Sequence, residues 1–188
     1  MDINEVHKIA GPMEGFISRK DGELLYRLAR LVPSGQVIVE IGSWKGKSAT
    51  YLAYGSMHGN NVPVYAVDHH TGSPEHRQGD AVWTYDDFWN NIRSAKVDHI
   101  VRPIVARSES VAPFVRWPIG LLFIDGEHSY TSVLADYRLW GSMVKPGGYI
   151  AFHDPDWAGV ARLLNELKST PHWKDWRREG GTMYAVRT

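Results

Sequence analysis

Val37-Ile-Val-Glu-Ile-Gly-Ser-Trp-Lys-Gly-Lys-Ser48 combines an apolar run, one acid and a turn that contains two glycines. The first five residues are apolar and mostly β-branched apart from the acid, which predicts a strand buried on both faces of a parallel sheet. Gly42 and Gly46 stand where that strand turns into a helix. Without a Cβ, a glycine lets the backbone adopt a positive φ or approach a ligand closely. We therefore expect a ligand site at this turn.

The turn lacks the glycine spacing of phosphate-binding loops. GxxxxGK[ST] or GxGxxG would direct several N–H groups at a phosphate, whereas this chain has E-x-G-x-x-x-G-x-S. A carboxylate at Glu40 would repel a phosphate, but it suits an ammonium group or ribose hydroxyls. The alternative is an ordinary strand, turn and helix whose glycines serve only the backbone.

A second short apolar run, Pro63-Val-Tyr-Ala-Val-Asp68, also ends in an acid. In dinucleotide-binding folds, an acid after a later strand binds the ribose hydroxyls. The carboxyl ends of neighbouring parallel strands meet at one edge of the sheet. Glu40 and Asp68 therefore predict a ribose site there.

At these residues the chain resembles the class I S-adenosylmethionine-dependent methyltransferases. The resemblance implies S-adenosylmethionine as cofactor, with Asp68 on its ribose. It also implies that Glu40, Gly42, Ser43, Gly46 and Ser48 surround the methionine part. Ser108 corresponds to a small polar residue that contacts adenine, although it could instead cap the helix expected from Ser110.

Asp68-His-His-Thr-Gly-Ser-Pro-Glu75 is similar to the D-x-x-T-G-x-P-E stretch of a smaller group. That group comprises macrolide-sugar O-methyltransferases of the macrocin and mycinamicin type, with relatives in cephalosporin gene clusters. The similarity extends over residues 37–154, with the motifs in the family's order. His69 and His70 replace the group's usual proline and tryptophan, so we expect the packing around adenine to differ.

Short apolar runs alternate with helical patterns, which predicts a single α/β domain over residues 1–188. A helical segment, residues 1–35, should precede a catalytic core, residues 36–188. By resemblance, the core is a Rossmann-like methyltransferase fold: a doubly wound, mostly parallel seven-stranded sheet with helices on both faces and an antiparallel C-terminal hairpin. We expect strands at residues 37–41, 64–67, 100–105, 119–124, 149–152, 173–178 and 182–187, and helices at residues 21–32, 47–57, 82–95, 110–115, 129–144 and 158–168. A long loop should enter the helix near residue 82.

The amino-acid composition indicates which kinds of partner the protein is expected to bind. Lys plus Arg equals Asp plus Glu at 21 each, without a run of like charge, which favours a small-molecule acceptor over nucleic acid or a membrane surface. No cysteine is present, so disulfides and thiolate chemistry are excluded. Residues 1–12 carry no signal-peptide apolar centre, and a cytoplasmic location is expected. A homo-oligomer is compatible with the sequence.

Acids also end the fourth and fifth expected strands, at Leu121-Leu-Phe-Ile-Asp125 and Ile150-Ala-Phe-His-Asp154. Ligands of open α/β sheets bind outside such strand ends, and carboxylate oxygens suit Mg²⁺. The resemblance assigns Asp125 and Asp154 to a divalent cation and leaves the third ligand between His153 and Asp156. The alternative is that the two acids cap turns or helices.

His128, three residues after Asp125, is the expected catalytic base. A hydroxyl needs help to lose its proton, which a cation and a base can provide together. An ordinary imidazole has a pKa near 6.5, so its neutral form is available, and the resemblance places a histidine base here. His128 could instead cap the helix that follows.

These residues predict divalent-cation-assisted O-methylation of a hydroxyl on a sugar, a glycoside, or another small polyol or natural product, with Asp125 and His128 in catalytic roles. One alternative is metal-independent methylation of a small molecule. A more remote one is a cofactor-binding protein without turnover. A nicotinamide-dependent oxidoreductase is disfavoured because GxGxxG is missing after the first strand.

Overall fold

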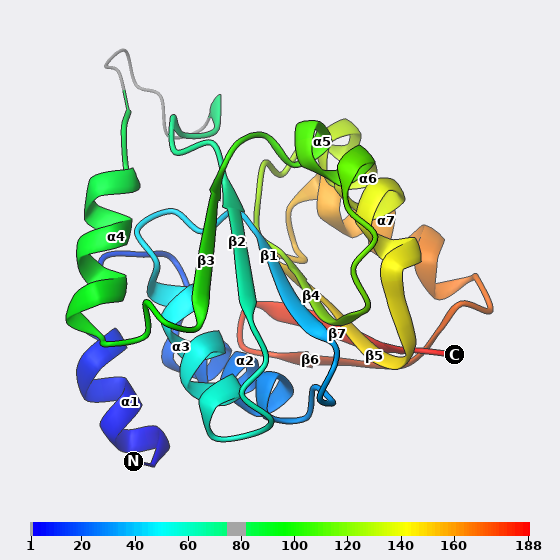
Figure 1. Ribbon diagram of the computed structural model, residues 1–188. Coiled ribbons are helices and arrows are strands. Elements are labelled where there is room, and N and C mark those ends of the chain that lie inside the picture. Colours follow the sequence, from blue (N-terminus) through cyan, green and yellow to red (C-terminus); the bar gives the residue numbers. More distant parts are fainter. Residues whose placement is uncertain (1, 75–81) are drawn as a thin grey trace.

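The structure is a computed structural model that describes residues 2–74 and 82–188. Its centre is a seven-stranded sheet in the order β3-β2-β1-β4-β5-β7-β6 (Figure 1). The strands are β1 (Val37–Ile41), β2 (Val64–Asp68), β3 (Val101–Val105), β4 (Ile119–Ile124), β5 (Val144–His153), β6 (Trp173–Glu179) and β7 (Thr182–Arg187). β1 to β5 pair in parallel, and β7 pairs antiparallel with both β5 and β6. The predicted fold, including the antiparallel hairpin at the C-terminus, is confirmed.

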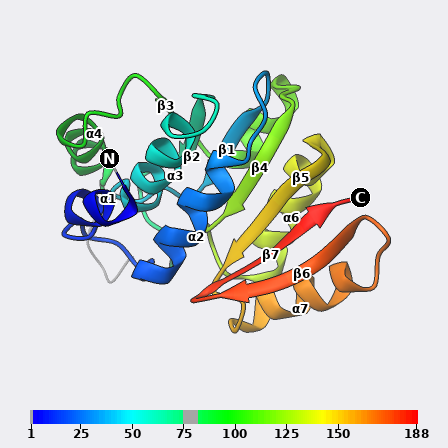
Figure 2. The ribbon, with the colours of Figure 1, turned by 90° about the horizontal axis from the view of Figure 1, so that it is seen from below.

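Helices cover both faces of this sheet (Figures 1 and 2). One face carries α1 (Ile3–Ala10), α2 (Arg19–Arg30), α3 (Lys47–Met57) and α4 (Tyr85–Ser94), and the other carries α5 (Ser108–Val111), α6 (Tyr130–Trp140) and α7 (Ala158–Lys168). Ile38 packs in the first core and Val39 in the second, because successive side chains of a strand point to opposite faces. This double coverage explains why all five residues of β1 are buried.

Several predicted boundaries differ from those observed. β5 begins at Val144, earlier than the strand expected from residue 149, and includes Lys145-Pro-Gly-Gly148, because a register shift between Ile119 and Leu121 accommodates the extra length. The helix expected at residues 129–144 ends at Trp140 and continues as the 3₁₀ helix η3 (Gly141–Met143).

The helix expected at residues 110–115 is likewise divided, into α5 and η2 (Ala112–Phe114). α4 begins only at Tyr85. Just before it, the Thr84 amide donates to the carbonyl of His70. Residues 75–81 of the expected loop, including Glu75, lie outside the described residues. Among the helices that are described, none has both the length and the apolar character needed to cross a bilayer.

Candidate active site

A cavity of about 770 Å³ lies at the carboxyl ends of the parallel strands. Its wall brings together most of the site residues predicted from the sequence: Gly42, Ser43, Ser48, Asp68, Ser108, Asp125, His128 and Asp154. Glu40 and Gly46 do not line it. Strand ends far apart in the sequence therefore converge on one pocket, as the parallel topology requires.

The turn after β1 depends on glycine at its first position. Gly42 has φ 85°, and a Cβ there would lie 2.1 Å from the carbonyl oxygen of Asp125. Gly46 also has a positive φ, at the N-terminus of α3, but its Cα faces Phe88 and Ile92 in the core. Gly42 thus permits the close approach of the β1 and β4 loops, whereas Gly46 permits close packing under α3.

The Asp68 carboxylate holds the same turn. Its Oδ2 accepts hydrogen bonds from the amides of Ser43 (2.9 Å) and Trp44 (2.8 Å). Its Oδ1 accepts one from the amide of His70 (2.7 Å). A carboxylate offers about four acceptor positions, so capacity remains for a ligand hydroxyl. The structural duty of Asp68 was not predicted from the sequence.

Glu40 lies beneath the cavity wall and is fully buried. Among the described residues, neither of its carboxylate oxygens has a hydrogen-bond partner. Burial raises the pKa of Glu40 to about 8, although the nearby hydroxyls of Ser48 and Ser43 favour the charged form. Burial therefore favours the protonated form of Glu40 in the ligand-free protein, whereas the sequence analysis expected a carboxylate that faces the ligand.

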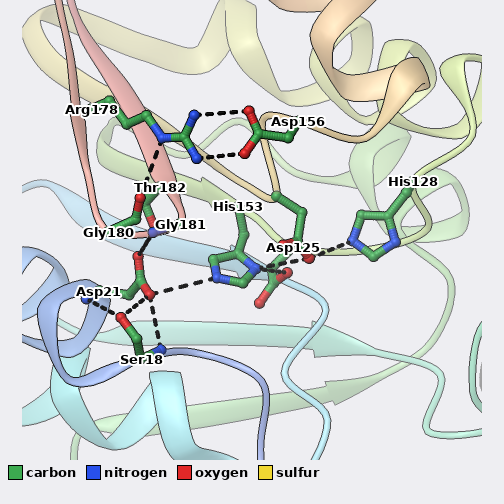
Figure 3. A network of polar contacts seen from close by, with 11 residues as sticks. Ser18, Asp21, Asp125, His128, His153, Asp156, Arg178, Gly180, Gly181 and Thr182 are labelled. Carbon is green, nitrogen blue, oxygen red and sulfur yellow. Dashed lines mark hydrogen bonds and ion pairs between the residues drawn. The ribbon is translucent and has the colours of Figure 1, made fainter.

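Asp125 after β4 and Asp154 after β5 lie close to two histidines, His128 and His153 (Figure 3). His128 Nε2 lies 3.2 Å from Asp154 Oδ2. His153 Nδ1 lies 3.2 Å from Asp125 Oδ1 and 3.1 Å from Asp154 Oδ2. Asp154 has φ 51°, a left-handed conformation that an aspartate tolerates better than most residues.

His153 is a buried cation within this cluster. Burial opposes its charge, but the carboxylates of Asp125, Asp154 and Asp21 around the ring outweigh burial and raise the pKa of His153 to about 12. Asp21 approaches from α2, with its Oδ2 3.8 Å from His153 Nε2. Asp21 also accepts from the Gly181 amide and the Thr182 hydroxyl, each at 2.8 Å. It therefore links α2, the terminal hairpin and the site.

Asp125, His128 and Asp154 could hold a metal ion. Each offers one ligand atom, and these atoms all lie within 4.8 Å of one another. Two carboxylate oxygens and an imidazole nitrogen are a donor set that fits a divalent cation. The third donor in this group is His128, which was not among the two candidates from the sequence.

Those two candidates have other partners. A protonated His153 has no lone pair to give a metal at Nδ1. Asp156 forms a bidentate ion pair with Arg178, with Nη–Oδ distances of 2.8 and 2.5 Å. The pair lies away from Asp125 and His128 (Figure 3).

The residues that cap the nearby helices exclude the helix-capping alternatives for His128 and Ser108. Ser129 is the N-cap of α6, and its hydroxyl accepts from the Ser132 amide, so His128 does not cap that helix. Arg107 occupies the N-cap position of α5. The Ser108 hydroxyl instead donates to Asp136 Oδ1. Both side chains therefore remain available for roles in the cavity that they line.

Aromatic side chains at the cavity were missed by the sequence analysis. Trp157 is 48% exposed and stacks on His128 with ring centroids 4.5 Å apart. Phe16 and Trp44 line the cavity with centroids 5.9 Å apart. The spacing of these aromatic residues in the sequence did not indicate a common site, because they come from separate loops.

His69 and His70, which replace the proline and tryptophan usual in the sugar-methylating group, have different environments. His69 lines the cavity. His70 is buried, and its Nδ1 lies 2.9 Å from the Thr84 hydroxyl, beside the rings of Tyr85 and Phe88. Only His69 can therefore contact a bound ligand.

Comparisons with known proteins agree with this fold. Residues 39–155 match the family described as "Methyltransferase domain". The uncharacterized protein R132 of Acanthamoeba polyphaga mimivirus is 39% identical over 67 residues, which are 34% of this chain and 29% of that protein. The match thus spans less than a third of the length of this viral relative.

Solved structures share the fold. The O-methyltransferase TomG of Streptomyces achromogenes, involved in tomaymycin synthesis and solved with S-adenosylmethionine, gives a TM-score of 0.69 at 18% identity, covering 99% of this chain and 87% of TomG. An O-methyltransferase of Bacillus cereus, solved with S-adenosylhomocysteine, gives a TM-score of 0.69 at 18% identity, covering 99% and 90% of the two chains.

Proposed function

Because this chain belongs to the methyltransferase-domain family, we propose that it transfers the methyl group of S-adenosylmethionine to a hydroxyl of a small acceptor. The observation that carries the proposal is the single cavity that holds Asp68 and Ser108 together with Asp125, His128 and Asp154. One cavity would thus accommodate the nucleoside at one end and a cluster suited to proton transfer at the other.

The cofactor is proposed to bind along the turn after β1 and the end of β2. Asp68 would accept from the ribose hydroxyls with the acceptor capacity that its backbone hydrogen bonds leave. Ser43 and Ser48 would lie beside the methionine part, over the carboxyl of Glu40. Ser108 would lie at the adenine end. The cofactor complexes solved for TomG and for the Bacillus cereus enzyme support this choice of ligand.

His128 is proposed to take the proton of the acceptor hydroxyl. Its Nε2 faces Asp154, and this carboxylate would orient the ring and stabilise the imidazolium that forms when the proton is taken. Stacking on Trp157 restrains the ring. A base positioned in this way contributes about 10²–10⁴-fold to the rate of a proton-transfer step.

Asp125 and Asp154 are proposed to hold a divalent cation, Mg²⁺ in our proposal, with His128 as a further donor in reach. When bound, such a cation would stabilise negative charge on the acceptor oxygen. If His128 serves as a ligand, the base role must pass to another group, and metal titrations of His128 variants distinguish the two roles.

A metal-independent methyltransferase is the second candidate, and one observation favours it. The His153 imidazolium contacts both Asp125 and Asp154, so one positive charge already offsets part of the negative charge that a cation would otherwise balance. Turnover by protein stripped of metal with a chelator decides between the candidates. Loss of turnover, restored by Mg²⁺, supports the first, and unchanged turnover supports the second.

The acceptor is proposed to be a sugar, a glycoside, or another small polyol or natural product. The exposed ring of Trp157 offers an apolar surface for the flat face of such an acceptor, and the rings of Phe16 and Trp44, which also line the cavity, offer further apolar surface. The test is methyl transfer from isotopically labelled S-adenosylmethionine to a panel of glycosides and phenols, followed by mass spectrometry. Methylation of a glycoside supports this acceptor class, and transfer to phenols alone contradicts it.

A further inference from the structure

Asp136 is a buried acid on the cavity wall that no step of the proposed reaction uses. It lies on α6 and is 7% exposed. Ser108, at the start of α5, is 8% exposed and donates its hydroxyl hydrogen to Asp136 Oδ1. Two helices thus present one hydrogen-bonded polar pair to the cavity.

The second oxygen of Asp136 faces the loop after β4. A Cβ added at Gly126 would lie 3.5 Å from Oδ2, in van der Waals contact with it, so the missing side chain leaves room for one ligand atom beside this oxygen. Gly126 itself lines the cavity. Because Gly126 carries no side chain, the flat edge of a ligand could reach Oδ2 across it.

Burial makes this acid costly to keep charged. It raises the pKa of Asp136 to about 6, opposed by the Ser108 hydrogen bond and assisted by the charges of Glu109 and Glu127. A buried carboxylate is stabilised by N–H donors. The ligand group that best complements this wall is therefore an amine with a hydrogen to donate.

The pair lies where the proposed cofactor would place its base. Asp68 at the end of β2 is the proposed ribose ligand, and the base of a bound nucleoside lies beyond its ribose, away from the glycine turn. Ser108 follows β3, the strand beside β2. The inference rests on the proposed function, because it requires the adenosyl group to occupy this end of the cavity.

We infer that Asp136 is the residue that selects adenine, by accepting a hydrogen bond from the exocyclic amine at Oδ2 while Ser108 holds Oδ1. A hydroxyl group alone could donate or accept and would not distinguish an amine from a carbonyl. A carboxylate accepts only, so a base with an oxygen in place of the amine leaves two acceptors facing each other.

The test compares S-adenosylhomocysteine with S-inosylhomocysteine, in which a carbonyl replaces the amine, by calorimetry on the full chain. The wild-type protein is expected to bind the adenosyl ligand at least about 10²-fold more tightly, since a site built for a donor rejects its replacement strongly. Asp136→Asn supplies an amide that can donate to the carbonyl. We expect this variant to reduce the preference at least about 10-fold.

Glu14→Gln is the matched control, because Glu14 is an acid of the same cavity but pairs with Lys45. This variant should keep the wild-type preference. Equal affinities of the wild-type protein for the two ligands would overturn the inference without recourse to any variant. So would an unchanged preference in a folded Asp136→Asn protein. Failure of wild-type protein to bind S-adenosylhomocysteine at all would instead overturn the proposed function.

Discussion

His128 and Asp154 form an acid–imidazole pair at the cavity, with 3.2 Å between Nε2 and Oδ2. The contact joins the loop after β4 to the end of β5. Ion-pair contacts with His128 and His153 hold the pKa of Asp154 well below its usual range. The carboxylate therefore stays ionised and can orient the imidazole at any pH where the enzyme would work.

Replacement of His128 by alanine tests the proposed base. We expect kcat to fall by roughly 10²–10⁴-fold, with little change in the affinity for S-adenosylhomocysteine, because the ring acts on the acceptor's proton. The loss of rate at low pH should also disappear. Rates come from labelled methyl transfer and affinities from calorimetry. His99→Ala, at an exposed site, is the control, and near-native kcat in His128→Ala would remove the base role.

Metal binding provides a second prediction. Asp125→Asn and Asp154→Asn should each weaken binding of Mg²⁺ by at least about 10-fold, because each removes a charged oxygen ligand. Asp156→Asn should bind the ion as the wild-type protein does, since Asp156 pairs with Arg178 instead. Calorimetric titration of the ion gives the affinities. Equal affinity in all four proteins would exclude the proposed cation site.

Because the carboxyl of Glu40 is buried, we expect the stability of the ligand-free protein to depend on pH. Burial raises the pKa of this carboxyl from 4.5 to about 8. The folded state thus holds a proton that the unfolded chain releases. The contribution of Glu40 to stability is fully present below pH 4.5 and is lost as pH rises toward about 8.

Glu40→Gln removes this dependence. We expect the free energy of unfolding to change less between pH 5 and 8, by on the order of a few kcal/mol relative to wild type, as measured by urea unfolding. Glu23→Gln is the control, because hydrogen bonds with His7 and Arg19 lower the pKa of Glu23. If the Glu40→Gln and wild-type profiles stay parallel, Glu40 is ionised in the folded protein.

Asp21 should matter to stability. Asp21→Asn weakens the acceptor for the Gly181 amide and the Thr182 hydroxyl and removes the negative charge beside His153. We expect a loss of about 1–3 kcal/mol in the free energy of unfolding, the usual cost of an impaired buried polar contact. Asp98→Asn, at an exposed site, is the comparison. Similar unfolding midpoints for the two variants would contradict the structural role of Asp21.

The sheet was predictable because its strands are local apolar runs. Val37–Ile41 and Ile119–Ile124 were predicted with their observed bounds. Their terminal acids could also be placed at one edge, because parallel strands share a direction. The length of β5 was not predictable, because a register shift against β4 decides where that strand begins.

Contacts between distant segments account for what the sequence analysis missed. The partner of Asp156 is on β6, and two partners of Asp21, Gly181 and Thr182, are in the terminal hairpin. Likewise, strand periodicity places Glu40 on one face of β1 but does not reveal that the following turn covers its carboxyl. Assigning these residues requires the folded arrangement.

Calorimetric titration with S-adenosylhomocysteine tests the central claim most directly. The account predicts one site of micromolar affinity in the wild-type protein. Asp68→Ala should weaken that affinity by about 1–3 kcal/mol, since ribose hydroxyls lose their acceptor, while Asp156→Ala should match the wild type. Absence of any binding heat or thermal shift in the wild-type protein would contradict the account.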